Sequence, residues 1–329
     1  MVTTEVDAAW SSVVSTLRAS RERTEKSEGT RTQLDVTLLT GFLGSGKTTV
    51  LRHLLENPGG LRIAVVVNDV GAVEVDAHLV KGVTPQQISL SNGCVCCLLA
   101  DDLADQLEHL TATGAYDSVL IEASGVADPI VIGQIIHSAN DCRLDGIVVV
   151  ADSTSVDAQL ADQQIAPLVA RQLQAAHLVI LSKCDLAGES ERQEVAELIA
   201  NVAPGSRIIE ANNGEVDLGL LVGAAVNGVS MANHEGAGGL AVAALVLEPA
   251  GPWNPIEVGK FLDDSAHRLL RAKGWFEDLQ RNLFQLQVVG RRWEIERWSG
   301  DAPRALVLIG LNPEDVATTK DQLQRISQD

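Results

Sequence analysis

The sequence has few basic residues and no long apolar run. Its 329 residues include 25 Lys and Arg against 44 Asp and Glu, which gives a formal net charge of −19 at pH 7. Nucleic-acid binding requires a basic face, so we expect no nucleic-acid partner. No apolar stretch reaches the ~18 residues that indicate a membrane helix, and the N-terminus has no apolar signal-peptide core. The sequence therefore predicts a cytoplasmic protein with no membrane partner.

Cysteine is also scarce, and its distribution is uneven. Three of the five cysteines fall within residues 94–97. Clustered cysteines in an intracellular protein more often bind metal or act in catalysis than form disulfides. The neighbours Cys96 and Cys97 are poor partners for an unstrained disulfide. We interpret the two isolated residues, Cys142 and Cys184, as packing residues.

Alternating apolar patterns dominate the first two thirds of the chain. From Leu34 to about Ile209, short β-branched runs are separated by longer helical patterns. This alternation predicts an α/β fold with a mostly parallel sheet covered by helices on both faces. The expected strands are Val36–Thr40, Ile63–Val67, Ser118–Ile121, Ile147–Val150 and Leu178–Leu181, and the expected helices include Lys47–Glu56, Asp101–Thr111, Val156–Ala175 and Glu191–Ala203.

The length and the changes in composition predict two domains with flanking segments. Residues 1–34 are expected to be an N-terminal extension and linker with a short helix at 8–20, and residues 35–210 the α/β domain. Residues 211–239 are rich in Gly and Asn and indicate a connector. Residues 240–329 predict a small α+β domain with an antiparallel sheet. Its expected elements are strand Ala241–Glu248, helix Pro255–Arg271, two or three strands within 275–297, strand Ala305–Ile309 and helix Pro313–Ile326.

A phosphate-binding loop follows the first expected strand. Residues 41–48 read Gly-Phe-Leu-Gly-Ser-Gly-Lys-Thr, which fits the pattern of Gly, four residues, Gly, Lys and Ser or Thr. The glycines allow backbone N–H groups to surround phosphates at a helix N-terminus. We expect Lys47 to contact the β- and γ-phosphates and Thr48 to place its hydroxyl on Mg²⁺. The predicted nucleotide-binding residues here are Gly41, Gly44, Ser45, Gly46, Lys47, Thr48 and Thr49.

A second segment ends an apolar strand with an acid. Residues 119–125 read Val-Leu-Ile-Glu-Ala-Ser-Gly. The position of Glu122 is where a P-loop protein keeps the carboxylate that organises Mg²⁺, and Gly125 can present its N–H to the γ-phosphate. We therefore predict Glu122 as a Mg²⁺ ligand and as a catalytic group together with Lys47 and Thr48.

A third segment indicates which base is bound. Residues 181–185 read Leu-Ser-Lys-Cys-Asp, which resembles the Asn-Lys-x-Asp guanine signature. An ionised carboxylate only accepts hydrogen bonds, and guanine offers a ring N–H and an amine that one carboxylate accepts together, whereas adenine does not. Asp185 thus favours GTP over ATP, and the stem of Lys183 can lie along the base. Ser182 in place of Asn is expected to lose one amide contact. An exposed surface pair is the alternative interpretation of the two charges.

The cysteine cluster predicts a metal site. Cys94, Cys96 and Cys97 can converge on one ion if Gly93 supplies a turn, and soft thiolates suit Zn²⁺, Cu(I) or Co²⁺. A closed structural zinc site needs four protein ligands, so the incomplete set indicates an exchangeable ion. A redox switch and a buried apolar trio remain alternatives.

Together these motifs resemble the CobW-like branch of metallochaperone GTPases, relatives of the GTPases that insert nickel into urease and hydrogenase. The resemblance implies a GTP-hydrolysing protein that binds Zn²⁺ or Co²⁺ through Cys94, Cys96 and Cys97 and delivers it to a client metalloenzyme apoprotein. The matching segments are Gly41–Thr49, Asn68–Asp76, Asn92–Cys97, Glu122–Pro129 and Ser182–Asp185, with weaker matches at residues 270–275 and Ala305–Gly310.

The sequence also departs from that family. Asp69 and Ala72 stand where Glu is usual, and Ala72 removes a metal-side carboxylate. Asp69, Glu74 and Asp76 remain candidate ligands for Mg²⁺ or the transition metal. A His-rich interdomain tract is missing, which favours transfer of a single ion over storage.

The sequence leaves two rival functions and the oligomeric state open. One rival function is a regulatory GTP-binding module with a structural metal ion. Another is a P-loop kinase acting on a small molecule, against which Asp185 argues. A homodimer is one assembly that the sequence leaves open.

Overall fold

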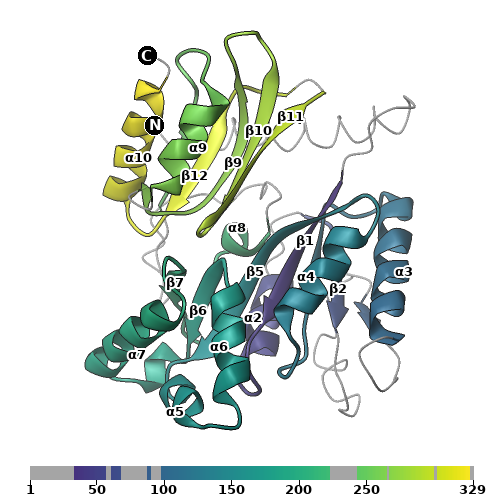
Figure 1. The fold of residues 1–329 in the computed structure, drawn as a ribbon, viewed down its shortest axis with the longest axis vertical. Coiled ribbons are helices and arrows are strands. Elements are labelled where there is room, and N and C mark those ends of the chain that lie inside the picture. Colours follow the sequence, from purple (N-terminus) through teal and green to yellow (C-terminus); the bar gives the residue numbers. More distant parts are fainter. Residues whose placement is uncertain are drawn as a thin grey trace. The chain divides into compact units, whose positions relative to one another are not determined.

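The computed structural model describes residues 33–56, 61–67, 87–89, 98–222, 243–264, 267–299 and 302–326. These residues fall into two compact units, one spanning 33–222 and the other following it, and each is treated by itself (Figure 1). The helix expected at 8–20, the segment 68–76 and the cysteines at 94, 96 and 97 lie outside the described residues. Within the described ranges, no helix combines the length and apolar character needed to cross a bilayer.

The first unit is organised by a parallel sheet. Its seven described strands run in the order β3-β2-β4-β1-β5-β6-β7, and every neighbouring pair is parallel. The predicted parallel sheet is thus confirmed, with β1 between β4 and β5. The strands are β1 (Leu34–Thr40), β2 (Ile63–Val67), β3 (Gln87–Ser89), β4 (Ser118–Glu122), β5 (Cys142–Asp152), β6 (Leu178–Ser182) and β7 (Arg207–Glu210).

Helices cover both faces of this sheet. In Figure 1, α3 (Leu98–Thr113), α4 (Pro129–Ser138) and α6 (Ala166–Ala175) lie in front of the sheet, and α2 (Lys47–Glu56) lies behind it. The remaining helices of the unit are α5 (Val156–Ala161), the 3₁₀ turn η1 (Cys184–Leu186), α7 (Glu189–Val202) and α8 (Leu218–Leu221).

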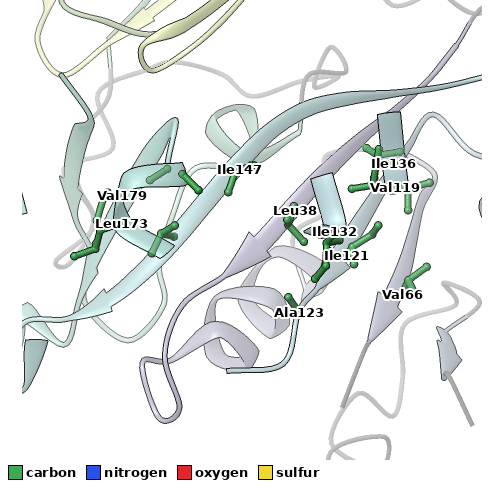
Figure 2. Close-up of a cluster of buried hydrophobic side chains, with 14 of the residues drawn as sticks. Leu38, Val66, Val119, Ile121, Ala123, Ile132, Ile136, Ile147, Leu173 and Val179 are labelled. Atoms are coloured by element: carbon green, nitrogen blue, oxygen red, sulfur yellow. The ribbon is translucent and has the colours of Figure 1, made fainter. Parts of the chain in front are cut away.

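Alternating strand residues build the core beneath the front helices. Successive strand side chains point to opposite faces, so every second residue meets the same helices. Leu38 of β1 and Ile121 of β4 therefore join Ile132 and Ile136 of α4 in one buried cluster (Figure 2). Both faces are covered, which is why β1 is buried along its whole length.

The predicted helix Val156–Ala175 is wrong as a single element. The chain forms α5 and then α6, and Asp162 follows α5 in an extended conformation. The Asp162 carboxylate accepts a hydrogen bond from the Gln164 N–H at 2.7 Å. Pro167 then falls in the first turn of α6, where its missing N–H costs nothing. The Asp162 turn and Pro167 therefore divide a stretch whose apolar periodicity is continuous.

The second unit is an antiparallel sheet of five described strands in the order β11-β10-β9-β12-β8. The small α+β domain predicted from the sequence is confirmed. Trp253 and Phe276 are fully buried in its core, with ring centroids 5.4 Å apart. Its elements are β8 (Ala243–Leu247), α9 (Pro255–Asp263), β9 (Leu269–Glu277), β10 (Leu283–Val289), β11 (Arg292–Trp298), β12 (Leu306–Gly310) and α10 (Pro313–Arg325).

The predicted helix Pro255–Arg271 is wrong in its second half. Helix α9 ends at Asp263, and Arg268 has a φ of 47°, which no α-helix accommodates. The chain then enters β9, which pairs antiparallel with β10 and with β12 at the same time. Two long-range partners determine the conformation of Leu269–Arg271, and they override the local helical pattern.

Candidate nucleotide-binding site

The predicted nucleotide-binding residues gather at the carboxyl edge of the parallel sheet. The phosphate loop follows β1, Glu122 ends β4 and Ser182 ends β6. Parallel strands direct their carboxyl ends to one edge, and open α/β sheets bind ligands there. The register places Leu39 of β1 beside Glu122. The topology therefore brings the three sequence motifs to one side of the unit.

Glycine is required at the start of the phosphate loop. Gly41 has a φ of 136°, and a Cβ at this position would lie 2.1 Å from the carbonyl oxygen of Val150 in β5. No side chain fits such a gap. Gly44 and Gly46 also have positive φ angles, of 74° and 97°. Helix α2 begins directly afterwards at Lys47, so its first N–H groups are available to an anion.

The Lys47 ammonium is held by the loop itself. Its Nζ donates to the carbonyl oxygens of Gly41 at 2.9 Å and Phe42 at 3.1 Å. The side chain is buried, with 8% of the residue exposed. A phosphate oxygen is a stronger partner for an ammonium than a neutral carbonyl. We therefore expect Lys47 to turn towards the phosphates when a nucleotide binds.

Thr48 and Glu122 are in direct contact. The Thr48 Oγ1 donates to the Glu122 Oε1 at 2.8 Å, and Glu122 is buried. One residue comes from the first turn of α2 and the other from the end of β4. Hydroxyl and carboxylate oxygens are hard ligands of the kind that Mg²⁺ prefers. The donor set of this pair fits a Mg²⁺ ion.

The turn after β4 lies against the phosphate loop. A Cβ on Gly125 would lie 2.7 Å from the Leu43 nitrogen and 2.9 Å from its Cα. Only glycine allows the two backbones to approach so closely. The Ala127 N–H donates to the Ser124 carbonyl at 3.0 Å and closes the turn. The predicted phosphate sensor is thus next to the predicted phosphate site.

The base-recognition residues occupy the loop after β6. Lys183 adopts a left-handed conformation with φ 57°, and its Nζ forms an ion pair with Asp152 at 2.5 Å. Asp185 lies in η1 and is exposed. No hydrogen bond joins its carboxylate to another group in the described ranges. This carboxylate is therefore accessible to a base, while Lys183 is held in place.

Asp152 is a site residue that sequence reasoning missed. Burial alone would raise the pKa of its carboxyl, but hydrogen bonds from Lys183 and Thr154 outweigh burial and hold the pKa below its usual value. A signal was available, because Asp152 ends β5 and polar residues at that edge of a sheet are functional candidates. The expected strand stopped at Val150, two residues short of it.

Ser182 links the base-recognition loop to the phosphate loop. Its Oγ donates to the carbonyl oxygen of Ser45 at 2.6 Å, and the Ala151 carbonyl lies 3.2 Å away. The sequence suggested only that Ser182 loses an amide contact with the base. The Ser182 hydroxyl thus connects two loops, a role that the spacing of residues in the sequence does not predict.

The start of the predicted connector packs against the first turn of α2, directly after the phosphate loop. A Cβ on Gly214 would lie 2.8 Å from the carbonyl carbon and oxygen of Thr49. The Thr37 hydroxyl donates to the Leu221 carbonyl at 2.6 Å. Residues 211–222 therefore pack as part of the first unit.

The described residues do not include the predicted transition-metal ligands, Cys94, Cys96 and Cys97. Across the described ranges, no group of three or more His, Cys, Asp or Glu is arranged to hold a metal ion. Burial raises the pKa of Cys142 to about 12 and also raises the pKa of Cys184. Both thiols lie in the apolar core, so their interpretation as packing residues is confirmed.

Comparisons with known proteins agree with these motifs. The model of the CobW/HypB/UreG nucleotide-binding domain matches residues 35–210, and that of the cobalamin synthesis protein cobW C-terminal domain matches residues 242–326. The chain is 33% identical to the zinc chaperone YjiA of Escherichia coli K12, over 85% of this chain and 95% of that protein. It is 31% identical to the zinc chaperone CobW of a Sinorhizobium species, over 88% and 96%.

A solved structure extends the comparison. The crystal structure of Zn(II)-bound YjiA GTPase from E. coli is 29% identical, with a TM-score of 0.45, over 88% of this chain and 99% of that chain. The two domain models together cover most of the sequence. The chain belongs to the CobW/HypB/UreG family and carries both its nucleotide-binding domain and a CobW C-terminal domain.

Proposed function

We propose that this protein is a cytoplasmic GTP-hydrolysing metallochaperone, which binds Zn²⁺ or Co²⁺ at Cys94, Cys96 and Cys97 and delivers it to a client metalloenzyme. The observation that carries the proposal is the contact between Thr48 and Glu122 beside a glycine-rich phosphate loop. The names of two relatives, both zinc chaperones, favour Zn²⁺ as the delivered ion.

The residues of the carboxyl edge have distinct roles in this proposal. Lys47 balances charge on the β- and γ-phosphates, and Gly125 offers its N–H to the γ-phosphate. Thr48 and Glu122 would hold Mg²⁺, which when bound supplies positive charge to the phosphates. The Asp185 carboxylate accepts the two N–H groups of guanine, and the Lys183 stem lies along the base.

The register of β2 and β3 supports a link between the nucleotide and metal sites. Val67, the last residue of β2, pairs with Glu122 and also with Ser89, the last residue of β3. Strands β2 and β3 therefore both end at the edge that carries Glu122, and the segments 68–76 and 90–97 follow these two strand ends in the sequence. A γ-phosphate that engages this edge is well placed to influence both segments.

We expect this link to make zinc and nucleotide binding interdependent. GTP with Mg²⁺ would order the segment 68–76 and the cysteines into a tight thiolate site, and hydrolysis would loosen it for the client. Thermodynamic linkage requires zinc to change GTP affinity by the same factor as GTP changes zinc affinity. Thiolate ligation releases protons, so zinc affinity should fall as the pH is lowered.

The experiment is a zinc titration against a competing chromophoric chelator, with the full chain loaded with GDP or with a non-hydrolysable GTP analogue. We expect zinc to bind roughly 5–150-fold more tightly with the analogue, the usual range of allosteric coupling. Cys96→Ser should lose this site and keep nucleotide binding. Cys142→Ser, at a buried cysteine distant from the motif in the sequence, is the matched control and should retain zinc.

Two outcomes would contradict the proposal. Equal zinc affinity with GDP and with the analogue would exclude a nucleotide-controlled site. Global unfolding of Cys96→Ser, with loss of nucleotide binding, would indicate a structural ion in a regulatory GTP-binding module.

A further inference from the structure

Gln172 is a buried polar residue in an otherwise apolar position. It lies on α6 between the core residues Val169 and Leu173, and only 1% of it is exposed. Its Nε2 donates to the carbonyl oxygens of Gly125 at 3.2 Å and Ala127 at 3.1 Å. Burying an amide costs free energy unless it is hydrogen-bonded, so these two bonds account for its presence in the core.

The two carbonyls determine the orientation of the amide. Carbonyl oxygens only accept hydrogen bonds, so the NH₂ group of Gln172 must face them. Its Oε1 is buried on the other side and has no hydrogen-bond partner among the described residues. The two N–H groups of Nε2 thus bond two carbonyls, one on each side of Val126. We call the Gln172 amide with the carbonyls of Gly125 and Ala127 the Gln172 clamp.

The clamp fixes the short turn that joins β4 to α4. Val126, between the two clamped carbonyls, is 53% exposed, so it adds little burial. The backbone of Gly125 packs against Leu43 of the phosphate loop. The segment is therefore held from one side by α6 and from the other by the phosphate loop. Loss of the clamp would remove the two hydrogen bonds that tie the segment to α6 and leave the Ala127–Ser124 turn bond and the contact with Leu43.

Resting on the proposed GTP-binding function, we infer that Gln172 is a positioning residue that holds Gly125 ready for the γ-phosphate and so favours GTP over GDP. GDP has no γ-phosphate and does not use the Gly125 N–H. GTP does, so a mobile Gly125 must be ordered before it can bind, and only GTP bears that entropic cost. Loss of the clamp should therefore lower the affinity for GTP relative to the affinity for GDP.

The test compares Gln172→Leu with Gln174→Leu in the full chain. Leu keeps the volume of residue 172 approximately and removes both donors, whereas residue 174 is an exposed glutamine on the same helix. Affinities for GDP and for a non-hydrolysable GTP analogue are measured with Mg²⁺ by fluorescence. We expect Gln172→Leu to bind the analogue about 5–10-fold more weakly and GDP within about twofold of wild type. Gln174→Leu should match wild type for both nucleotides.

Gln172→Glu tests the hydrogen bonds without changing the shape. Burial beside two carbonyls should raise the pKa of the new carboxyl. Above that pKa the carboxylate places only acceptors against the two carbonyls, and the analogue-to-GDP affinity ratio should fall at least as far as in the Leu variant. A protonated carboxyl regains one donor. The ratio should therefore recover partly as the pH is lowered, relative to wild type at the same pH. A merely structural role for Gln172 would produce no such recovery.

The outcomes separate this inference from the proposed function. If wild type prefers GTP and the Gln172 variants lose both affinities equally, or neither, Gln172 does not position Gly125 and the inference is overturned. If wild type binds neither guanine nucleotide, the proposed function itself fails. A selective loss of analogue binding, with recovery of the Glu variant in acid, supports both.

Discussion

The amino and carboxyl edges of the parallel sheet both carry buried charges, but the partners differ. At the amino edge, two nitrogens of Arg143 donate to the Asp35 carboxylate at 2.6 and 3.0 Å. At the carboxyl edge, Glu122 accepts a hydrogen bond from the uncharged hydroxyl of Thr48. The first carboxylate is neutralised by a fixed cation. The second is bonded by a hydroxyl, and hydroxyl and carboxylate oxygens are both ligands that Mg²⁺ accepts.

A second pair of interactions repeats the contrast. Near the amino edge, Arg62 binds both oxygens of Asp117, at 2.8 and 3.2 Å. At the carboxyl edge, Asp152 pairs with Lys183. The Arg62 and Lys183 side chains are 49% and 37% exposed, so the two pairs differ in geometry and not in exposure. The guanidinium fork binds its carboxylate through two nitrogens, whereas the lysine ammonium binds through one. We therefore expect the charges at the amino edge to act mainly in stability and those at the carboxyl edge to act in ligand binding.

The largest effect is expected from Glu122→Gln at the carboxyl edge. Loss of the negative charge should lower GTP hydrolysis by roughly 10–100-fold, because Glu122, which together with Thr48 would hold Mg²⁺, becomes neutral. The melting temperature should stay close to that of wild type, since Gln keeps the shape and the acceptor. Hydrolysis is measured by phosphate release and stability by calorimetry. A large fall in stability with unchanged hydrolysis would contradict the view that Glu122 acts in ligand binding and not in stability.

Arg143→Met at the amino edge should show the opposite pattern. It leaves the Asp35 carboxylate, 7% exposed, without its main cation, which costs about 3 kcal/mol. That corresponds to a melting temperature about 6–12 °C lower for a unit of this size. Nucleotide affinity of the folded protein should not change.

A double substitution provides the control for this prediction. Adding Asp35→Leu to Arg143→Met removes the stranded charge and should recover part of the stability, since paired apolar replacements of buried ion pairs are often tolerated. No recovery would mean that the loss came from packing and not from charge.

The smallest effect is expected from Asp152→Asn. The pair with Lys183 is partly exposed, so its loss should weaken guanine-nucleotide binding by only about 2–5-fold at neutral pH. The pKa of Asp152 is lowered from 3.8 because the hydrogen bonds of Lys183 and Thr154 outweigh its burial.

The acid dependence of stability checks the sign of that shift. A carboxyl whose pKa falls on folding stabilises the protein fully above its unfolded pKa, near 3.8, and this stability is lost as the pH falls through the lower folded pKa. Asp152→Asn should therefore lose less stability than wild type in that range. Parallel acid denaturation curves for the two proteins would contradict the prediction.

Much of the first unit was predictable because its strands are continuous apolar runs with short-range signals. The phosphate loop and Lys183 follow strands directly and Glu122 ends one, and parallel strands bring such positions to one edge of the sheet. Gln172 was not predicted, because its partners are backbone carbonyls of a segment distant in sequence. Its signal was weak: a lone glutamine on the apolar face of a helix, next to Leu173.

The errors arose where long-range contacts overrode local patterns. Residues 269–271 have a helical apolar spacing, yet they pair with β10 and β12. The role of Ser182 depends on a carbonyl of the phosphate loop, which no sequence rule specifies. The arrangement of Cys94, Cys96 and Cys97 stays a prediction.

The central claim is that the carboxyl edge of the sheet binds a guanine nucleotide through Asp185, and Asp185→Asn tests it most directly. Calorimetric titration should show that wild type prefers GTP to both ATP and XTP. The variant should bind GTP about 10–100-fold more weakly and should bind XTP more tightly than wild type does, since an amide can donate to the additional carbonyl of xanthine. Unchanged GTP affinity in the variant would contradict the assignment of the base site.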